Sequence, residues 1–586
     1  MRKPENKAPK GTVKKVLALL SRYRGRLLLS LLFAALNVAF TLAIPLLFGQ
    51  AVDLIAGPDS VDLPGVLGKL AVCLILIVLC ALAAWAMARI NNAVTCNTVR
   101  DLRDRAFAKI NVLPFSYLDS HPTGETLSRV VNDADQFAEG LLLGFSQFFT
   151  GVLTIGGTLL LLIRLHPLIA AVVALLTPLS LFAARFIARR SYRYFRARTG
   201  LRAEQTAQIE EITGNLKTVR AFGRSKAEQK TFDEGNDRLA GATLKAIFVS
   251  SVTNPATRFV NALVYAAVAL AGAFCVLGKF GGGLTVGMLA TALSFANQYT
   301  KPFNEISAVF AELQNSLCCA ARVLELIDAP AETPDPPDAV VPANVEGRME
   351  LKDVSFSYDK SKTLLEHVNV SVRPGQTVAI VGPTGCGKTT LINLLMRFYD
   401  PDAGEICLDG NETRTLTRAG LRAACGMVLQ ETWLKNATVR ENICMGKPDA
   451  TEEEMIAAAK KAHAHAFISR LPQGYDTVLG EEGGALSQGQ KQLLCITRVM
   501  LSAPPILLLD EATSSIDLRT EIRVQKAFAR LMENRTCFVV AHRLSTIMHA
   551  DLILVMNEGN IVEQGTHAEL LEKGGFYAEL WNSQFA

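Results

Sequence analysis

Long apolar segments fill the first half of this 586-residue chain, whereas the second half alternates short apolar runs with amphipathic stretches. An α-helix needs about 20 mainly apolar residues to span a bilayer. Six stretches of the first half reach this length: 27–48, 66–88, 138–163, 168–187, 247–277 and 284–310. We therefore predict six transmembrane helices.

The charges beside these stretches predict their orientation. The loop 51–65 contains Asp53, Asp59 and Asp62 and no basic residue, whereas six arginines lie between residues 189 and 202. Basic residues gather on the cytoplasmic side of a membrane, so both chain ends are expected there. No small-residue cleavage site follows the first apolar stretch, which therefore predicts a membrane span and not a signal peptide.

The segments 91–137 and 189–245 mix charges with helical apolar spacing, which predicts that the spans continue as helices into the cytoplasm. Each segment contains a break, at 115–119 and at 213–220, where a short crossing helix can lie. Ordinary solvated hairpins are the alternative.

Several polar side chains interrupt the fifth and sixth predicted spans. A charge at the centre of a bilayer costs roughly 2.5 to 3.5 kcal/mol on insertion scales, so these groups should face a bundle interior or a wet cavity. Lys301 and Glu305 are four residues apart and can pair with each other. The candidate substrate-lining residues are Arg258, Asn261, Asn297, Gln298, Lys301 and Glu305.

The composition changes after residue 327. The segment 328–347 contains five prolines and several acids and predicts an exposed linker between a membrane domain at 1–327 and a soluble domain at 348–586. Strand-like alternation at 349–358, followed by apolar runs and helical patterns, indicates an α/β domain. The predicted fold is thus an α-helical membrane domain of six transmembrane helices fused to a soluble α/β domain.

The overall composition argues against two classes of function. The formal net charge of +5 is too small to indicate nucleic-acid binding. The twelve cysteines show no spacing typical of a metal site, which predicts reduced thiols in a reducing compartment.

A phosphate-binding pattern, G-x-x-x-x-G-K-[ST], lies between an apolar strand at 377–381 and a helix at 390–395. Glycines let backbone N–H groups point at phosphate oxygens, Lys388 adds a positive charge, and the Thr389 hydroxyl can reach Mg²⁺. Because Cys386 lies inside the loop, thiol alkylation should inhibit the ATPase and ATP should protect it. The predicted ATP-binding residues here are Gly382, Pro383, Thr384, Gly385, Cys386, Gly387, Lys388, Thr389 and Thr390.

A second motif completes the predicted nucleotide site. The apolar run 505–509 is typical of a strand buried on both faces, and it ends in Asp510 and Glu511. Ligands of such sheets bind at the carboxyl ends of the strands. We expect Asp510 to hold Mg²⁺ and Glu511 to act as the general base that polarises the attacking water.

The pentapeptide Leu486-Ser487-Gln488-Gly489-Gln490 resembles the signature of ABC transporters, and it precedes a predicted helix at 491–501. Nearly the whole chain is similar to bacterial half-size ABC exporters of the multidrug and lipid-flipping type. Six spans exclude the soluble ABC-type ATPases. The resemblance also identifies the two breaks at 115–119 and 213–220 with the coupling helices of that family.

The resemblance assigns further roles residue by residue. It implies that Tyr358 stacks on adenine, Gln430 senses Mg²⁺, and His542 contacts the γ-phosphate after the strand 538–541. The loop Glu481-Glu482-Gly483 resembles the exporter loop before the signature. Residues Ser514, Ser515 and Asp517 match the loop that communicates between two ATP sites.

The family resemblance implies a dimer, because the signature of one subunit closes over ATP held by the other. Gln488 replaces the usual glycine, and Ser515-Ile516 replaces a more usual alanine-leucine pair. These departures resemble one subunit of the heterodimeric exporters with two unequal ATP sites, and a homodimer is the alternative.

The resemblance implies ATP-driven export of a hydrophobic or amphipathic small molecule, a drug-like compound or a lipid, by alternating access across the cytoplasmic membrane. A lipid flippase shares this architecture, and an importer or an ATP-gated channel is a remoter alternative. The expected cofactors are ATP and Mg²⁺, and the expected partners are a second half-transporter, membrane lipid and the substrate, with no nucleic acid.

Overall fold

The computed structural model describes residues 11–55, 62–277, 283–359, 363–429, 432–480, 483–484, 486–510, 517–541 and 544–585. The chain divides into two compact units. The first comprises Met1–Asn111 and Thr123–Ala329, and the second comprises Val112–Pro122 and Pro330–Ala586.

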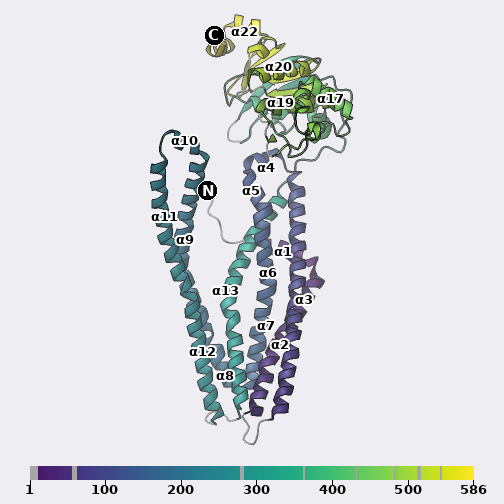
Figure 1. The fold of residues 1–586 in the computed structure, drawn as a ribbon. Coiled ribbons are helices and arrows are strands. Elements are labelled where there is room, and N and C mark those ends of the chain that lie inside the picture. The colour runs from purple at the N-terminus through teal and green to yellow at the C-terminus, as the bar shows by residue number, and fades with distance from the viewer. Residues whose placement is uncertain are drawn as a thin grey trace. The chain divides into compact units, whose positions relative to one another are not determined.

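Long helices make up the described part of the first unit (Figure 1). Their bounds are α1 (Thr12–Ser21), α2 (Arg24–Ile55), α3 (Leu63–Ile110), α5 (Thr123–Ser128), α6 (Ala134–Leu143), α7 (Phe149–Leu165), α8 (Pro167–Leu176), α9 (Pro178–Gly214), α10 (Leu216–Ala221), α11 (Ser225–Ser251), α12 (Thr253–Val276) and α13 (Val286–Asp328). Two π-helical turns, η1 (Arg129–Asp133) and η2 (Gly144–Phe148), interrupt the helix that runs from α5 to α7.

Within the described residues, four helical stretches are long and apolar enough to cross a membrane: Arg24–Ile55, Leu63–Ile110, Thr123–Leu165 and Ser225–Val276. The two other predicted spans, 168–187 and 284–310, lie on α8–α9 and on α13. Thr177 separates α8 from α9, which begins at Pro178, so α8 is a short apolar helix of ten residues. Helix α13 carries Asn297, Gln298, Lys301 and Glu305 within the sixth predicted span, and it is not among these four stretches.

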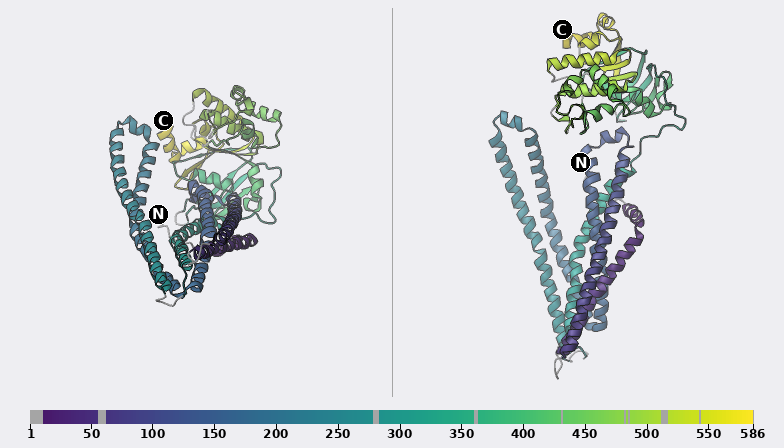
Figure 2. Two further views of the ribbon diagram at one scale, coloured as in Figure 1. Left: turned by 60° about the horizontal axis from the view of Figure 1, so that its bottom comes forward. Right: turned by 45° about the vertical axis from the view of Figure 1, so that its right-hand side comes forward.

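The two predicted breaks do form short helices. Helix α10 joins α9 to α11, which run side by side as a hairpin (Figure 2). Helix α4 (Phe115–Ser120) belongs to the second unit, where the ring centroids of Phe115 and Phe398 lie 4.5 Å apart. The sequence-based prediction of a helix at each break is therefore confirmed.

The second unit contains two sheets. A six-stranded sheet has the order β10-β9-β3-β8-β7-β6, with parallel pairing from β9 to β6, and an antiparallel sheet has the order β2-β1-β4-β5. The strands are β1 (Met349–Phe356), β2 (Leu365–Val372), β3 (Thr377–Val381), β4 (Ala403–Leu408), β5 (Asn411–Glu412), β6 (Cys425–Val428), β7 (Ile506–Asp510), β8 (Thr536–Val540), β9 (Leu552–Asn557) and β10 (Asn560–Gly565).

Helices pack around these sheets. Their bounds are α14 (Lys388–Leu395), α15 (Arg418–Ala423), α16 (Val439–Cys444), α17 (Glu452–Lys461), α18 (His465–Ile468), α19 (Gln488–Ser502), α20 (Leu518–Met532), α21 (Leu544–Met548), α22 (His567–Lys573) and α23 (Phe576–Phe585). The central strands β7 and β8 are buried almost throughout, as their continuous apolar runs predict.

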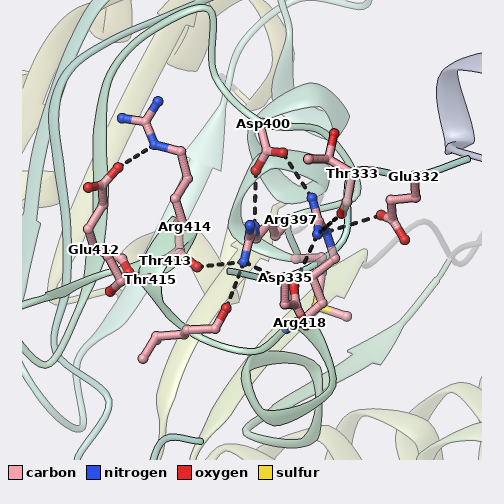
Figure 3. A network of polar contacts seen from close by, with 12 residues as sticks. Glu332, Thr333, Asp335, Arg397, Asp400, Glu412, Thr413, Arg414, Thr415 and Arg418 are labelled. Atoms are coloured by element: carbon pink, nitrogen blue, oxygen red, sulfur yellow. Dashed lines mark hydrogen bonds and ion pairs between the residues drawn. The ribbon is translucent and has the colours of Figure 1, made fainter. Parts of the chain in front are cut away.

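The segment that precedes β1 is held on the second unit by a network of arginines and acids (Figure 3). Arg418 donates to Asp335 and Asp400, both at 3.0 Å, and to the carbonyl oxygen of Thr333. Arg397, which is 5% exposed, donates to Asp400 at 3.0 Å and to the carbonyl oxygen of Thr413. The proline-rich linker is thus anchored at its start by buried guanidinium groups, whose charges the paired acids compensate.

Candidate functional site

The phosphate loop has the backbone that its glycines predict. Gly382, Gly385 and Gly387 have φ angles of 154°, 84° and 103°, which residues with a side chain rarely adopt. A Cβ on Gly382 would lie 2.2 Å from the carbonyl oxygen of Met556. The loop leads into α14, whose N-terminus favours negative charge. This geometry suits a phosphate group.

Lys388 folds back over the loop that it belongs to. Its Nζ donates to the carbonyl oxygens of Gly382 at 2.8 Å and Pro383 at 2.9 Å. The neighbouring Thr389 is exposed, whereas Thr390 and Cys386 are buried. Lys388 and Thr389 are therefore available to a ligand, while Cys386 and Thr390 support the loop from inside.

Parallel pairing aligns the ends of three neighbouring strands. Val540 of β8 is paired with Ile380 of β3 on one side and with Asp510 of β7 on the other. Asp510, half-buried, therefore lies at the same edge of the sheet as the start of the phosphate loop. Carboxylate and hydroxyl oxygens are the ligands that Mg²⁺ prefers, so Asp510 and Thr389 suit this ion.

Tyr358 presents a ring at the surface. It is 50% exposed, its ring centroid lies 5.0 Å from that of Tyr399, and its hydroxyl accepts a hydrogen bond from Asn393 of α14 at 3.3 Å. Asn393 places Tyr358 beside the helix that follows the phosphate loop. An exposed ring there can stack on a base.

The signature residues form the start of α19. Ser487 and Gln490 make a capping box, in which the Ser487 N–H donates to Gln490 Oε1 at 2.9 Å. Gln488 donates from Nε2 to the Thr432 hydroxyl at 3.2 Å. Gly489 is buried and Leu486 half-buried. These hydrogen bonds connect the signature to its own helix and to Thr432.

Asp517 caps α20. Its Oδ1 accepts from the Thr520 N–H at 2.9 Å, and this backbone hydrogen bond lowers the pKa of the carboxyl group. Other predicted site residues lie outside the described residues, namely Gln430, Glu511, Ser514, Ser515 and His542, together with the acids at 481 and 482.

In the first unit, two of the predicted substrate-lining residues share a cavity of about 280 Å³ between α12 and α13. Asn261 and Asn297 line it together with Tyr265 and Thr300. Asn261 Oδ1 is buried without a hydrogen-bond partner. Arg258, Gln298, Lys301 and Glu305 are not among the lining residues, and Lys301 and Glu305, both described, make no ion pair with each other.

One cavity beside the phosphate loop could not be inferred from the motifs. A cavity of about 140 Å³ is lined by the phosphate loop and by Tyr577, Leu580 and Trp581 of the C-terminal helix α23. The spacing of these three residues places them on one face of a helix and predicts that this face is buried. The spacing does not predict which surface the face packs against.

Comparisons with known proteins cover both units. Residues 27–303 match the ABC transporter transmembrane region family, and residues 365–514 match the ABC transporter family. The chain is 40% identical over 533 residues to a fatty acid ABC transporter ATP-binding/permease protein of Mycobacterium bovis, covering 90% of this chain and 84% of the relative.

Two further matches agree. The chain is 35% identical to an ATP-dependent lipid A-core flippase of Syntrophus aciditrophicus, over 83% of this chain and 80% of that protein. The solved structure of a bacterial Atm1-family ABC exporter with ATP bound is 31% identical, with a TM-score of 0.78 and coverage of 97% of this chain and 99% of that chain.

Proposed function

The chain belongs to the half-size ABC exporters, and from this premise we propose that its cargo is an amphipathic acid with a long apolar chain. It is a multi-pass membrane protein with a cytoplasmic ATPase domain, and ATP hydrolysis drives its transport. Exporters of this size act as dimers.

We assign separate roles in ATP binding and hydrolysis to residues of the second unit. The loop Gly382–Thr389 and Lys388 bind the phosphates of ATP, and Tyr358 stacks on the base. Thr389 and Asp510, with Gln430, would hold Mg²⁺, and the ion would supply charge stabilisation to the phosphoryl group that is transferred. Glu511 accepts a proton from the attacking water, and His542 contacts the γ-phosphate.

The cavity between α12 and α13 carries the substrate proposal. The amide groups of Asn261 and Asn297 line this cavity and can orient a polar group of a substrate. Buried polar atoms normally have a hydrogen-bond partner, and Asn261 Oδ1 has none. Arg258 lies one turn before Asn261 on α12. A carboxylate near Arg258 would offset the cost of a charge in the membrane. The relative named as a fatty acid transporter supports the same class.

A pair of ligands tests this class. We expect a long-chain fatty acid to stimulate the ATPase of the reconstituted transporter and the matching fatty alcohol, which lacks the carboxylate, to stimulate it at least about tenfold less effectively, the factor that ~1.4 kcal/mol gives. Equal stimulation by both would favour the second candidate, a neutral drug-like or lipid cargo.

Asn261→Leu removes the amide at similar volume and should raise the half-maximal concentration of the acid about tenfold. Asn254→Leu is the matched control, because Asn254 lies on the same helix, is exposed, and does not line the cavity. An Asn261→Leu variant with unchanged stimulation would contradict the assignment of this cavity.

We further propose that the working dimer is a heterodimer. Gln488, at the position of the usual signature glycine, carries a side chain that is engaged with Thr432, and it would complete the weaker of two ATP sites. ATPase activity only after co-expression with the product of the neighbouring gene supports this proposal. Full activity of the chain alone would show a homodimer.

A further inference from the structure

The C-terminal helix α23 is fixed to the sheet at its start. The Glu563 carboxylate of β10 accepts hydrogen bonds from the backbone N–H groups of Phe576 and Tyr577, both at 3.0 Å. A carboxylate at a helix N-terminus is favoured by the helix dipole. Glu563 therefore ties the start of α23 to β10.

One face of α23 is apolar and packs onto the strands of the nucleotide site. Tyr577 is 2% exposed, and its hydroxyl lies 2.7 Å from Nδ1 of His567. Burial raises the pKa of Tyr577 to about 12, so the hydroxyl stays protonated at neutral pH. Trp581, one turn further on, has its ring centroid 4.5 Å from that of His567. The two aromatic rings are thus held in defined positions.

This face meets the phosphate loop. Tyr577 packs in one apolar cluster with Val381, the residue before Gly382, and with Ala541, the last described residue before His542. Trp581 packs against the same cluster. The cavity of about 140 Å³ is lined by Trp581 together with Pro383, Thr384 and Lys388 of the loop.

The exposed part of the phosphate loop would be stabilised by a packing partner. Pro383, Thr384 and Gly385 are exposed, so this part of the loop has few packing contacts of its own. Binding is weakened when a loop must be ordered at the moment a ligand arrives. A rigid aromatic wall that limits the conformations of Pro383 and Thr384 would reduce this cost.

We propose that Trp581 is a positioning residue of the ATP site, whose indole holds the Pro383–Thr384 segment of the phosphate loop in the conformation that accepts ATP. This inference rests on the proposed role of Gly382–Thr389 in binding ATP. On this proposal the C-terminal helix contributes to the affinity for ATP, although it carries no nucleotide-binding motif.

Tryptophan fluorescence tests the proposed contact between Trp581 and the phosphate loop. The chain contains three tryptophans, so Trp85→Phe/Trp433→Phe retains only Trp581. We expect its emission to change on addition of ATP, with a midpoint equal to the Kd measured by calorimetry, and we expect Lys388→Ala to shift both the midpoint and the Kd to at least about tenfold higher ATP. Binding by calorimetry without any emission change would overturn the proposal while leaving the ATP site intact. Absence of ATP binding to the unmodified chain would overturn both.

Steady-state kinetics test the positioning role. Trp581→Ala should raise KM for ATP about three- to tenfold with kcat within about twofold, as expected when binding and not the transition state is affected. Trp581→Phe should restore most of the affinity. Asn582→Ala is the matched control, because Asn582 is exposed and does not line the cavity. An equal loss of kcat in Trp581→Ala and Trp581→Phe, with KM unchanged, would show a purely structural role.

Discussion

The ammonium group of Lys388 donates a hydrogen bond of 2.8 Å to the carbonyl oxygen of Gly382, the first residue of the phosphate loop. The lysine thus stays close to the loop and has only to turn its protons from backbone carbonyls to phosphate oxygens. We therefore expect Lys388 to contribute to ATP binding through its charge and not through packing.

Lys388→Ala should therefore abolish tight ATP binding with little effect on folding. Charge-assisted hydrogen bonds to an anion are about twice as strong as neutral ones, and we expect Kd for ATP to rise at least about tenfold. Calorimetric titration measures this change. A melting temperature close to that of the unmodified chain would confirm that the fold is retained, and an unchanged Kd would contradict the role of Lys388.

Glu511→Gln should leave ATP binding intact and reduce turnover by roughly 10² to 10⁴, the contribution of a general base. The amide keeps the shape of the side chain but cannot accept the proton. Single-turnover hydrolysis in the assembled transporter measures the effect. Glu453→Gln, at an exposed position on α17, provides the control, and turnover equal in both variants would exclude Glu511 as the base.

Two glycines of one loop should respond differently to substitution. In Gly382→Ala the new Cβ would lie 2.2 Å from a backbone oxygen, so we expect about 2–4 kcal/mol lower stability together with weak ATP binding. In Gly385→Ala the new Cβ would have no atom within 4 Å. Only the positive φ of residue 385 would then lower the stability, by about 1 kcal/mol. Chemical denaturation of the two variants measures the difference, and equal losses would contradict the close contact at Gly382.

Alkylation of Cys386 should be slow. The sequence places this thiol inside the phosphate loop and predicts inhibition with protection by ATP, yet the side chain is only 3% exposed. Reagents should therefore react mainly during transient opening of the loop. Mass spectrometry of the modified peptide against time, with exposed Cys96 as the reference thiol, measures the rate. Equal rates at the two cysteines would show that the loop is open most of the time.

The sequence predicts those features that depend on local patterns. Strands β3 and β7 follow from apolar runs. The helix expected at 491–501 begins three residues earlier, at Gln488, because Ser487 and Gln490 form a capping box there. Features that depend on contacts between distant segments were not predictable in this way. The cavity between α23 and the phosphate loop brings together residues about 200 positions apart, and no spacing rule connects Trp581 with Pro383.

Interruptions of the helices were also missed. The π-helical turns η1 and η2 shift the register of the helix that runs from α5 to α7. No glycine or proline in η1 indicates the first interruption. Of the six polar residues proposed to line a substrate site, two share a cavity. Helical spacing alone could not select these two, because the selection depends on how α12 packs on α13.

The central claim is ATP-driven export of an amphipathic acid, and uptake into inside-out membrane vesicles tests it most directly. Vesicles that contain the chain and the product of its neighbouring gene should accumulate a radiolabelled long-chain fatty acid when ATP is added, and vesicles with Glu511→Gln should not. Equal accumulation with and without a functional Glu511, or none with either, would contradict this account.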